Sequence, residues 1–137
     1  MNISFDNERI NIGEDSLRYD SYYLDDDGRL HTNMRNLLRQ WYIILSSLIE
    51  REVAYLPYSI ADESVSCLKV EKNKDSLSLR CVTIVYPGYA ISLDDLVLFA
   101  RSTEHEICHE FPQYFGVFQF SEFINALKLA LDIRNGD

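Results

Sequence analysis

The sequence predicts an α+β domain in which an antiparallel sheet of about four to five strands packs, in two layers, against two or three helices. Three segments lead to this prediction: an amphipathic helix over residues 33–51, a β-hairpin over residues 65–86, and a strand followed by a helix over residues 114–131. The chain has 137 residues and no linker or low-complexity tract, so we expect a single domain over residues 1–137.

The clearest element is the helix predicted over Asn33–Arg51. Thr32 or Asn33 can accept a hydrogen bond from a free N–H group of its first turn. Because its apolar stripe is too wide to remain in water, we expect the sheet to cover it and the last helix to pack beside it. The stripe is formed by residues at helical spacing: Met34, Leu37, Leu38, Trp41, Ile44, Leu45, Leu48 and Ile49.

A hairpin is predicted after this helix. Val65–Lys72 and Leu77–Tyr86 have the composition of strands, and they flank the turn-forming residues Asn73–Ser76. The second strand carries apolar residues on both faces, which indicates an interior position in the sheet. Before the hairpin, Pro57 is expected to stop the first helix from continuing, and Ser59–Ser64 is predicted to be a polar loop.

The N-terminal segment has the pattern of short strands separated by turns. Apolar and polar residues alternate over residues 3–5 and again over residues 10–12. Residues 19–24 are richer in strand formers and lead to a turn at Asp25–Gly28, after which residues 29–31 can return as a second short strand.

The C-terminal third mixes helix and strand signals. A helix is predicted over residues 93–101, although Leu96–Ala100 fits a buried strand equally well, and residues 102–111 show no decisive pattern. A strand is predicted over Tyr114–Phe120, followed by a last helix with Ser121 as its N-terminal cap.

The formal net charge is -9, from 22 acidic and 13 basic residues. This balance disfavours nucleic-acid binding, which relies on Lys and Arg to displace counterions. It fits a soluble protein whose molecules are kept apart by mutual repulsion, or an acidic partner of a basic protein. Three cysteines without a C-x-x-C pair predict a reducing compartment. With no signal peptide and no apolar run long enough to span a bilayer, we expect a cytoplasmic protein without a membrane partner.

The segment His105–His109 matches the H-E-x-x-H motif of zinc hydrolases. On a helix, His105 and His109 would face the same way and share a zinc ion, with Glu106 as general base. The flanks do not suit this interpretation, because Pro112 prevents the helix from continuing and a polar stretch precedes His105. We therefore expect no metal site and keep a zinc-dependent hydrolase as the alternative function.

Other motifs that carry chemistry are incomplete. The acidic stretch before Gly28 fails as a calcium loop, because Tyr23 and Met34 stand where an EF-hand needs carboxylates. None of the glycine-rich phosphate-binding motifs occurs. We therefore expect no cofactor and no enzymatic activity.

Clusters of acidic residues with nearby tyrosines are the remaining functional signal. Such clusters suit an interface with a basic protein, because long-range attraction speeds association and tyrosine supplies anchors. The alternative is a scattered, solvated surface. The candidate partner-binding residues are Asp25, Asp26, Asp27, Tyr58, Asp62, Glu63, Tyr89, Asp94, Asp95, Glu104 and Glu106.

Three stretches together give the chain a family resemblance: the Trp41-bearing helix, Leu56–Val70 entering the hairpin, and Gly116–Leu127 closing as strand and helix. In size, charge and element order over about residues 33–131, the chain resembles the small acidic immunity proteins of bacterial polymorphic toxin systems. The resemblance implies a non-catalytic inhibitor that occludes the active site of a toxin, often a basic nuclease. A structural or regulatory homo-oligomeric subunit is the third alternative.

Overall fold

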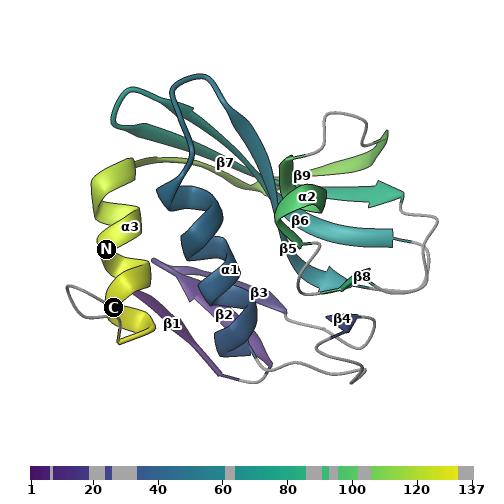
Figure 1. The fold of residues 1–137 in the computed structure, drawn as a ribbon, viewed down its shortest axis with the longest axis horizontal. Coiled ribbons are helices and arrows are strands. Elements are labelled where there is room, and N and C mark those ends of the chain that lie inside the picture. The colour runs from purple at the N-terminus through teal and green to yellow at the C-terminus, as the bar shows by residue number, and fades with distance from the viewer. Residues whose placement is uncertain are drawn as a thin grey trace.

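The computed structural model describes residues 1–6, 8–18, 24–25, 34–60, 64–85, 91–92, 96–101 and 106–132 (Figure 1). Within these ranges it gives side-chain positions for all residues except 24–25, 91–92, 96–98 and 106–115.

The largest element is a four-stranded antiparallel sheet with the strand order β5-β6-β7-β9. Strands β6 (Ser64–Asn73) and β7 (Ser76–Val85) form the predicted hairpin, in which Asn73 pairs with Ser76. Strand β7 lies between β6 and β9 (Glu106–Gln119), as its apolar residues on both faces predicted.

Strand β5 (Val53–Ile60) corrects the prediction for the segment around Pro57. Pro57 lies inside this strand, and the strand runs on through Ser59 and Ile60, which were predicted to begin a polar loop. Proline is tolerated here because β5 is an edge strand and its pairing register shifts between Pro57 and Ser59.

The N-terminal segment forms a separate three-stranded antiparallel sheet of β1 (Ile3–Phe5), β2 (Arg9–Ile12) and β3 (Asp15–Arg18). Strand β4 (Leu24–Asp25) pairs in parallel with β8 (Ile91–Ser92). The turn expected after Asp25, and the return strand after it, fall outside the described residues.

Helix α1 (Met34–Ser46) carries the predicted stripe as far as Leu45, and this part of the stripe is buried. Beyond the helix, Leu48 is also buried, whereas Ile49 is exposed. The helix ends at Ser46, before the predicted Arg51, and at its end the Ser47 hydroxyl donates to the carbonyls of Ile43 and Ile44. Trp41 fixes the helix to the sheet, since its indole N–H donates to the Pro57 carbonyl at 2.9 Å.

Two further helices complete the described part of the chain. Helix α2 (Leu96–Arg101) confirms the helical interpretation of that segment. Helix α3 (Phe120–Ala130) begins without a side-chain cap from its own N-terminal residue. Ser121, the predicted cap, lies inside α3. The Asp75 carboxylate, from the β6–β7 turn, accepts bonds from the Ser121 backbone N–H and hydroxyl, both at 3.2 Å.

The four-stranded sheet, the helices α1 and α3 and the three-stranded sheet enclose one core (Figure 1). Helix α1 contacts α3 and β5, and α3 also contacts β1 and β7, so the last helix packs beside the first as predicted. These antiparallel sheets packed with helices confirm the α+β class, although the strands are divided between sheets of four and three strands and one parallel pair. Among the described residues, no helix is both long and apolar enough to cross a membrane.

Candidate protein-interaction surface

The net charge of -9 comes from 22 acidic and 13 basic residues, and many of the acidic residues are close neighbours in the sequence. The acid clusters are Asp25 to Asp27, Asp62 with Glu63, Asp94 with Asp95, and Glu104 with Glu106 and Glu110.

The sheet topology brings together the described residues that flank several of these acids. Ser64, the first residue of β6, pairs with Val85, the last residue of β7, and Val85 also pairs with Glu106, the first residue of β9. Ile60 ends β5 beside them, paired with Val65. These four strand ends form one end of the sheet, on the right in Figure 1, which we call the acid-flanked end.

The acid clusters are close in sequence to this end. Asp62 and Glu63 stand between Ile60 and Ser64, and Glu104 stands two residues before Glu106. The β4–β8 pair relates two further acid clusters. Asp25 of one cluster pairs with Ser92, and Ser92 stands two residues before Asp94 in the sequence. The strand pairing thus relates acid clusters that are far apart in the sequence.

The structure places the predicted partner-binding residues in three groups. Asp25 and Glu106 have the backbone positions given above. Tyr58 is a correction, because only 7% of its surface is exposed and its ring belongs to the core rather than to an outer surface. The other predicted residues lie outside the described part of the chain: Asp26, Asp27, Asp62, Glu63, Tyr89, Asp94, Asp95 and Glu104.

The H-E-x-x-H segment does not have the helical geometry that a zinc site requires. Residues from Glu106 to His109 belong to β9, and His109 pairs with Thr83 of β7. Four residues span about 13 Å along a strand, compared with about 6 Å along a helix. His105 lies outside the described residues. Among those that are described, no three His, Cys, Asp or Glu side chains gather as metal ligands.

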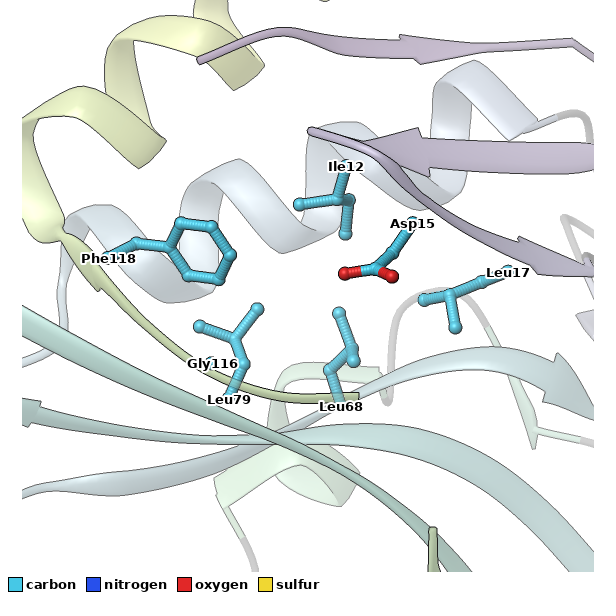
Figure 2. Close-up of a pocket in the computed structure, with 7 residues that line it drawn as sticks. All are labelled: Ile12, Asp15, Leu17, Leu68, Leu79, Gly116 and Phe118. Carbon is cyan, nitrogen blue, oxygen red and sulfur yellow. The ribbon is translucent and has the colours of Figure 1, made fainter. Parts of the chain in front are cut away.

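A small hollow lies between the two antiparallel sheets (Figure 2). Its volume is about 20 Å³, enough for about one water molecule and too small for a substrate. The carboxylate of Asp15 reaches into it from β3, and the other lining residues are Ile12, Leu17, Leu68, Leu79, Gly116 and Phe118. A side chain at Gly116 would lie 2.9 Å from the Phe118 ring, so this glycine allows the ring to fold back over β9.

Cys67 and Cys81 are buried free thiols. Burial raises the pKa of Cys67 well above its usual value. It also raises the pKa of Cys81 to about 11, and a hydrogen bond with Tyr58 offsets only part of this effect. Both groups therefore remain protonated near neutral pH, which suits packing rather than nucleophilic chemistry.

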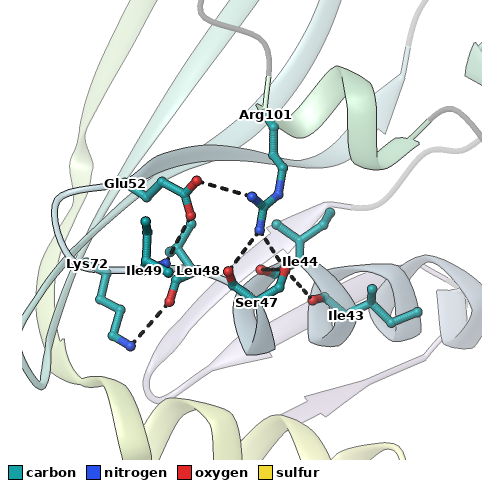
Figure 3. Close-up of polar contacts among 8 residues, drawn as sticks. All are labelled: Ile43, Ile44, Ser47, Leu48, Ile49, Glu52, Lys72 and Arg101. Atoms are coloured by element: carbon teal, nitrogen blue, oxygen red, sulfur yellow. Dashed lines mark hydrogen bonds and ion pairs between the residues drawn. The ribbon is translucent and has the colours of Figure 1, made fainter.

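A polar network joins the end of α1 to α2 and β5 (Figure 3). The Arg101 guanidinium bonds to the Glu52 carboxylate at 3.1 Å and to the carbonyl and hydroxyl of Ser47 at 3.1 and 2.6 Å. Lys72 adds a bond from its ammonium group to the Leu48 carbonyl at 3.3 Å. Sequence reasoning missed this network, because its partners are up to 54 positions apart.

Comparisons with protein-family models, with curated proteins and with solved structures find no match. The immunity and zinc-hydrolase interpretations therefore depend on the residues of this chain alone.

Proposed function

We propose that this protein is a non-catalytic protein-binding domain, and that it acts as an immunity protein that binds and neutralises a cognate bacterial toxin. The observation that carries the proposal is the net charge of -9, together with acid clusters whose described neighbours meet at the acid-flanked end. A toxin that cleaves nucleic acid needs a basic surface to hold phosphates. An acidic surface has the charge complementary to such a site.

Inhibition of this kind requires binding without chemistry. Acidic residues on the inhibitor attract a basic partner over about one Debye length and raise the association rate. Once bound, the inhibitor excludes the nucleic acid because both compete for the same cationic groups.

The partner can be sought in the neighbouring reading frame, where the gene of a secreted protein with a C-terminal toxin domain is expected. Its toxin domain should bind the purified protein, and the association rate should fall about tenfold or more between low and high salt. Absence of binding, or a rate that does not change with salt, would contradict the proposal.

A matched pair of variants tests which acids matter. Asp62→Asn with Glu63→Gln and Glu8→Gln with Glu14→Gln each remove two negative charges, but Glu8 and Glu14 are exposed residues of the three-stranded sheet region. The first pair should slow association more strongly than the second. Equal slowing would mean that only the net charge counts.

A further inference from the structure

The outward face of the three-stranded sheet combines two arginines with neutral polar residues. Side chains alternate along each strand, and the apolar residues of β1, β2 and β3 belong to the core. Asp15, the acid of β3, lies on the core side and reaches into the hollow between the sheets (Figure 2). The outward residues are exposed or half-buried, and none is acidic: Ser4, Arg9, Asn11, Ser16 and Arg18. This face therefore carries a local positive charge on an otherwise acidic protein.

The two arginines stand directly opposite each other. Arg9 of β2 pairs with Arg18 of β3 in the antiparallel register, so their Cβ atoms lie about 5 Å apart on the same face. Arg9 Nη1 donates to Ser16 Oγ at 3.4 Å, and Ser16 precedes Arg18 by two residues on β3. The Arg9 guanidinium thus extends toward the strand that carries Arg18. Like charges directly opposite each other repel and weaken the pairing of their strands.

The described acids around this pair do not neutralise it by direct contact. The Asp6 carboxylate accepts the backbone N–H groups of Glu8 and Arg9 at 2.7 and 2.9 Å. These two bonds lower the pKa of Asp6, and the charge of Arg9 adds a smaller effect in the same direction. The side chains of Glu8 and Glu14 are exposed and form no ion pair with a described residue. Arg18 has no hydrogen bond or ion pair with any residue that the structure describes.

We propose that Arg9 and Arg18 form a binding site for a phosphate group. A guanidinium presents parallel N–H donors in a planar fork that fits phosphate oxygens. A doubly charged phosphate between the two arginines can accept bonds from both, so its binding would replace one repulsion with two attractions. The site lies on an open sheet face, which suits either a free phosphate ion or a phosphomonoester. It does not depend on the proposed binding of a toxin.

Titration of the full-length protein with inorganic phosphate tests the site, with chloride used to keep the ionic strength constant. Nuclear magnetic resonance signals of the Arg9 and Arg18 guanidinium groups should shift and saturate. Arg18→Gln should bind phosphate about tenfold more weakly than the wild type. Arg39→Gln is the matched control and should bind like the wild type, because Arg39 is exposed on α1 and has no hydrogen bond or ion pair with any described residue. Equal phosphate affinity of the two variants would overturn the proposal, as would equal shifts with chloride alone.

Thermal unfolding gives the second measurement. Arg18→Gln removes the repulsion between the arginines, so it should melt no lower than the wild type in a buffer without phosphate. Phosphate should raise the melting temperature of the wild type more than that of Arg18→Gln, because a ligand that binds only the folded state stabilises it. Arg18→Lys retains the charge without the fork and should respond to an intermediate degree.

A comparison of inorganic phosphate with the phosphomonoester phenyl phosphate distinguishes the two sources of the group. Stronger stabilisation by inorganic phosphate would assign the site to the free ion, and stronger stabilisation by phenyl phosphate would assign it to a phosphate carried by a larger molecule. If neither compound stabilises the wild type more than Arg18→Gln, the proposal is refuted.

Discussion

At the scale of single residues, Trp41 illustrates how local pattern and distant contact combine. Its position on an apolar stripe predicted burial, and only 1% of its surface is exposed. The stripe did not reveal that its N–H group would bond to the carbonyl of Pro57 in β5. Periodicity identifies which side of a helix is buried, but it cannot identify the partner of a polar atom on that side.

Replacing this tryptophan should destabilise the protein in two steps. Trp41→Phe leaves the Pro57 carbonyl without its donor and should cost about 1–3 kcal/mol, whereas Trp41→Ala also creates a cavity and should cost about 3–5 kcal/mol. Urea denaturation followed by circular dichroism measures both. Leu129→Ala is the control, because Leu129 is 82% exposed and its loss should change the free energy of unfolding by less than about 0.5 kcal/mol.

The buried thiols predict a dependence of stability on alkaline pH. The pKa of Cys81 is raised to about 11 in the folded protein from an ordinary value of 9.0. Between these two pH values the thiol ionises more readily in the unfolded chain, so a rising pH favours unfolding. The stabilising contribution is complete below pH 9 and is lost as the pH approaches 11. The free energy of unfolding should therefore decrease over this interval, and Cys81→Ala should reduce the slope. An unchanged slope in this variant would refute the assignment.

At the scale of elements, the hairpin and α1 were predicted because their signals are local. The hairpin is specified by a turn between two strand-like runs, and the bounds of its strands agree with the prediction to within one residue. Strand β9 was not predicted over its full length, because part of its pattern also fits a helix and Pro112 interrupts it. Its pairing with β7 skips residues between Phe111 and Gly116, and this irregularity accommodates the proline.

The start of α3 gives a test at this scale. Asp75→Ala removes the carboxylate that accepts two bonds from Ser121, and it should destabilise the protein by about 1 kcal/mol. Asp75→Asn retains an acceptor oxygen and should cost less. Thermal unfolding of both variants measures these effects. Glu122→Ala is the control, because it removes an exposed acidic residue from the first turn of α3 without removing the Asp75 carboxylate. Equal melting temperatures for Asp75→Ala and this control would contradict the capping role.

At the scale of the whole molecule, the amino-acid composition contains the acidic excess on which the proposed function rests. Composition alone does not tell where in the fold the acidic residues lie. The acidic excess could be counted in the sequence, but the strand pairing that brings the neighbours of several acid clusters to one end of the sheet could not be foreseen. Tyr58 was wrongly assigned to the outer surface because a tyrosine beside a proline suggests a loop, whereas here it belongs to a strand. Glu52 and Arg101 could not be linked in advance, since nothing local relates residues 49 positions apart.

Metal analysis distinguishes the proposed function from the zinc-hydrolase alternative. Because residues 106–109 form part of a strand, we expect protein purified without a nickel resin to contain far less than one zinc per chain. The expected content is unchanged in His105→Ala and in His109→Ala. Near-stoichiometric zinc that is lost in His105→Ala would instead favour the hydrolase.

The contact between β1 and α3 joins the beginning of the described chain to its end. During synthesis β1 leaves the ribosome before every other described element, and α3 leaves it after all of them. The core around Phe123 and Leu127 cannot close before that moment, so an incomplete chain exposes the apolar face of the first helix to chaperones and proteases. The core is therefore expected to close only after α3 has been synthesised, however early the first strands emerge.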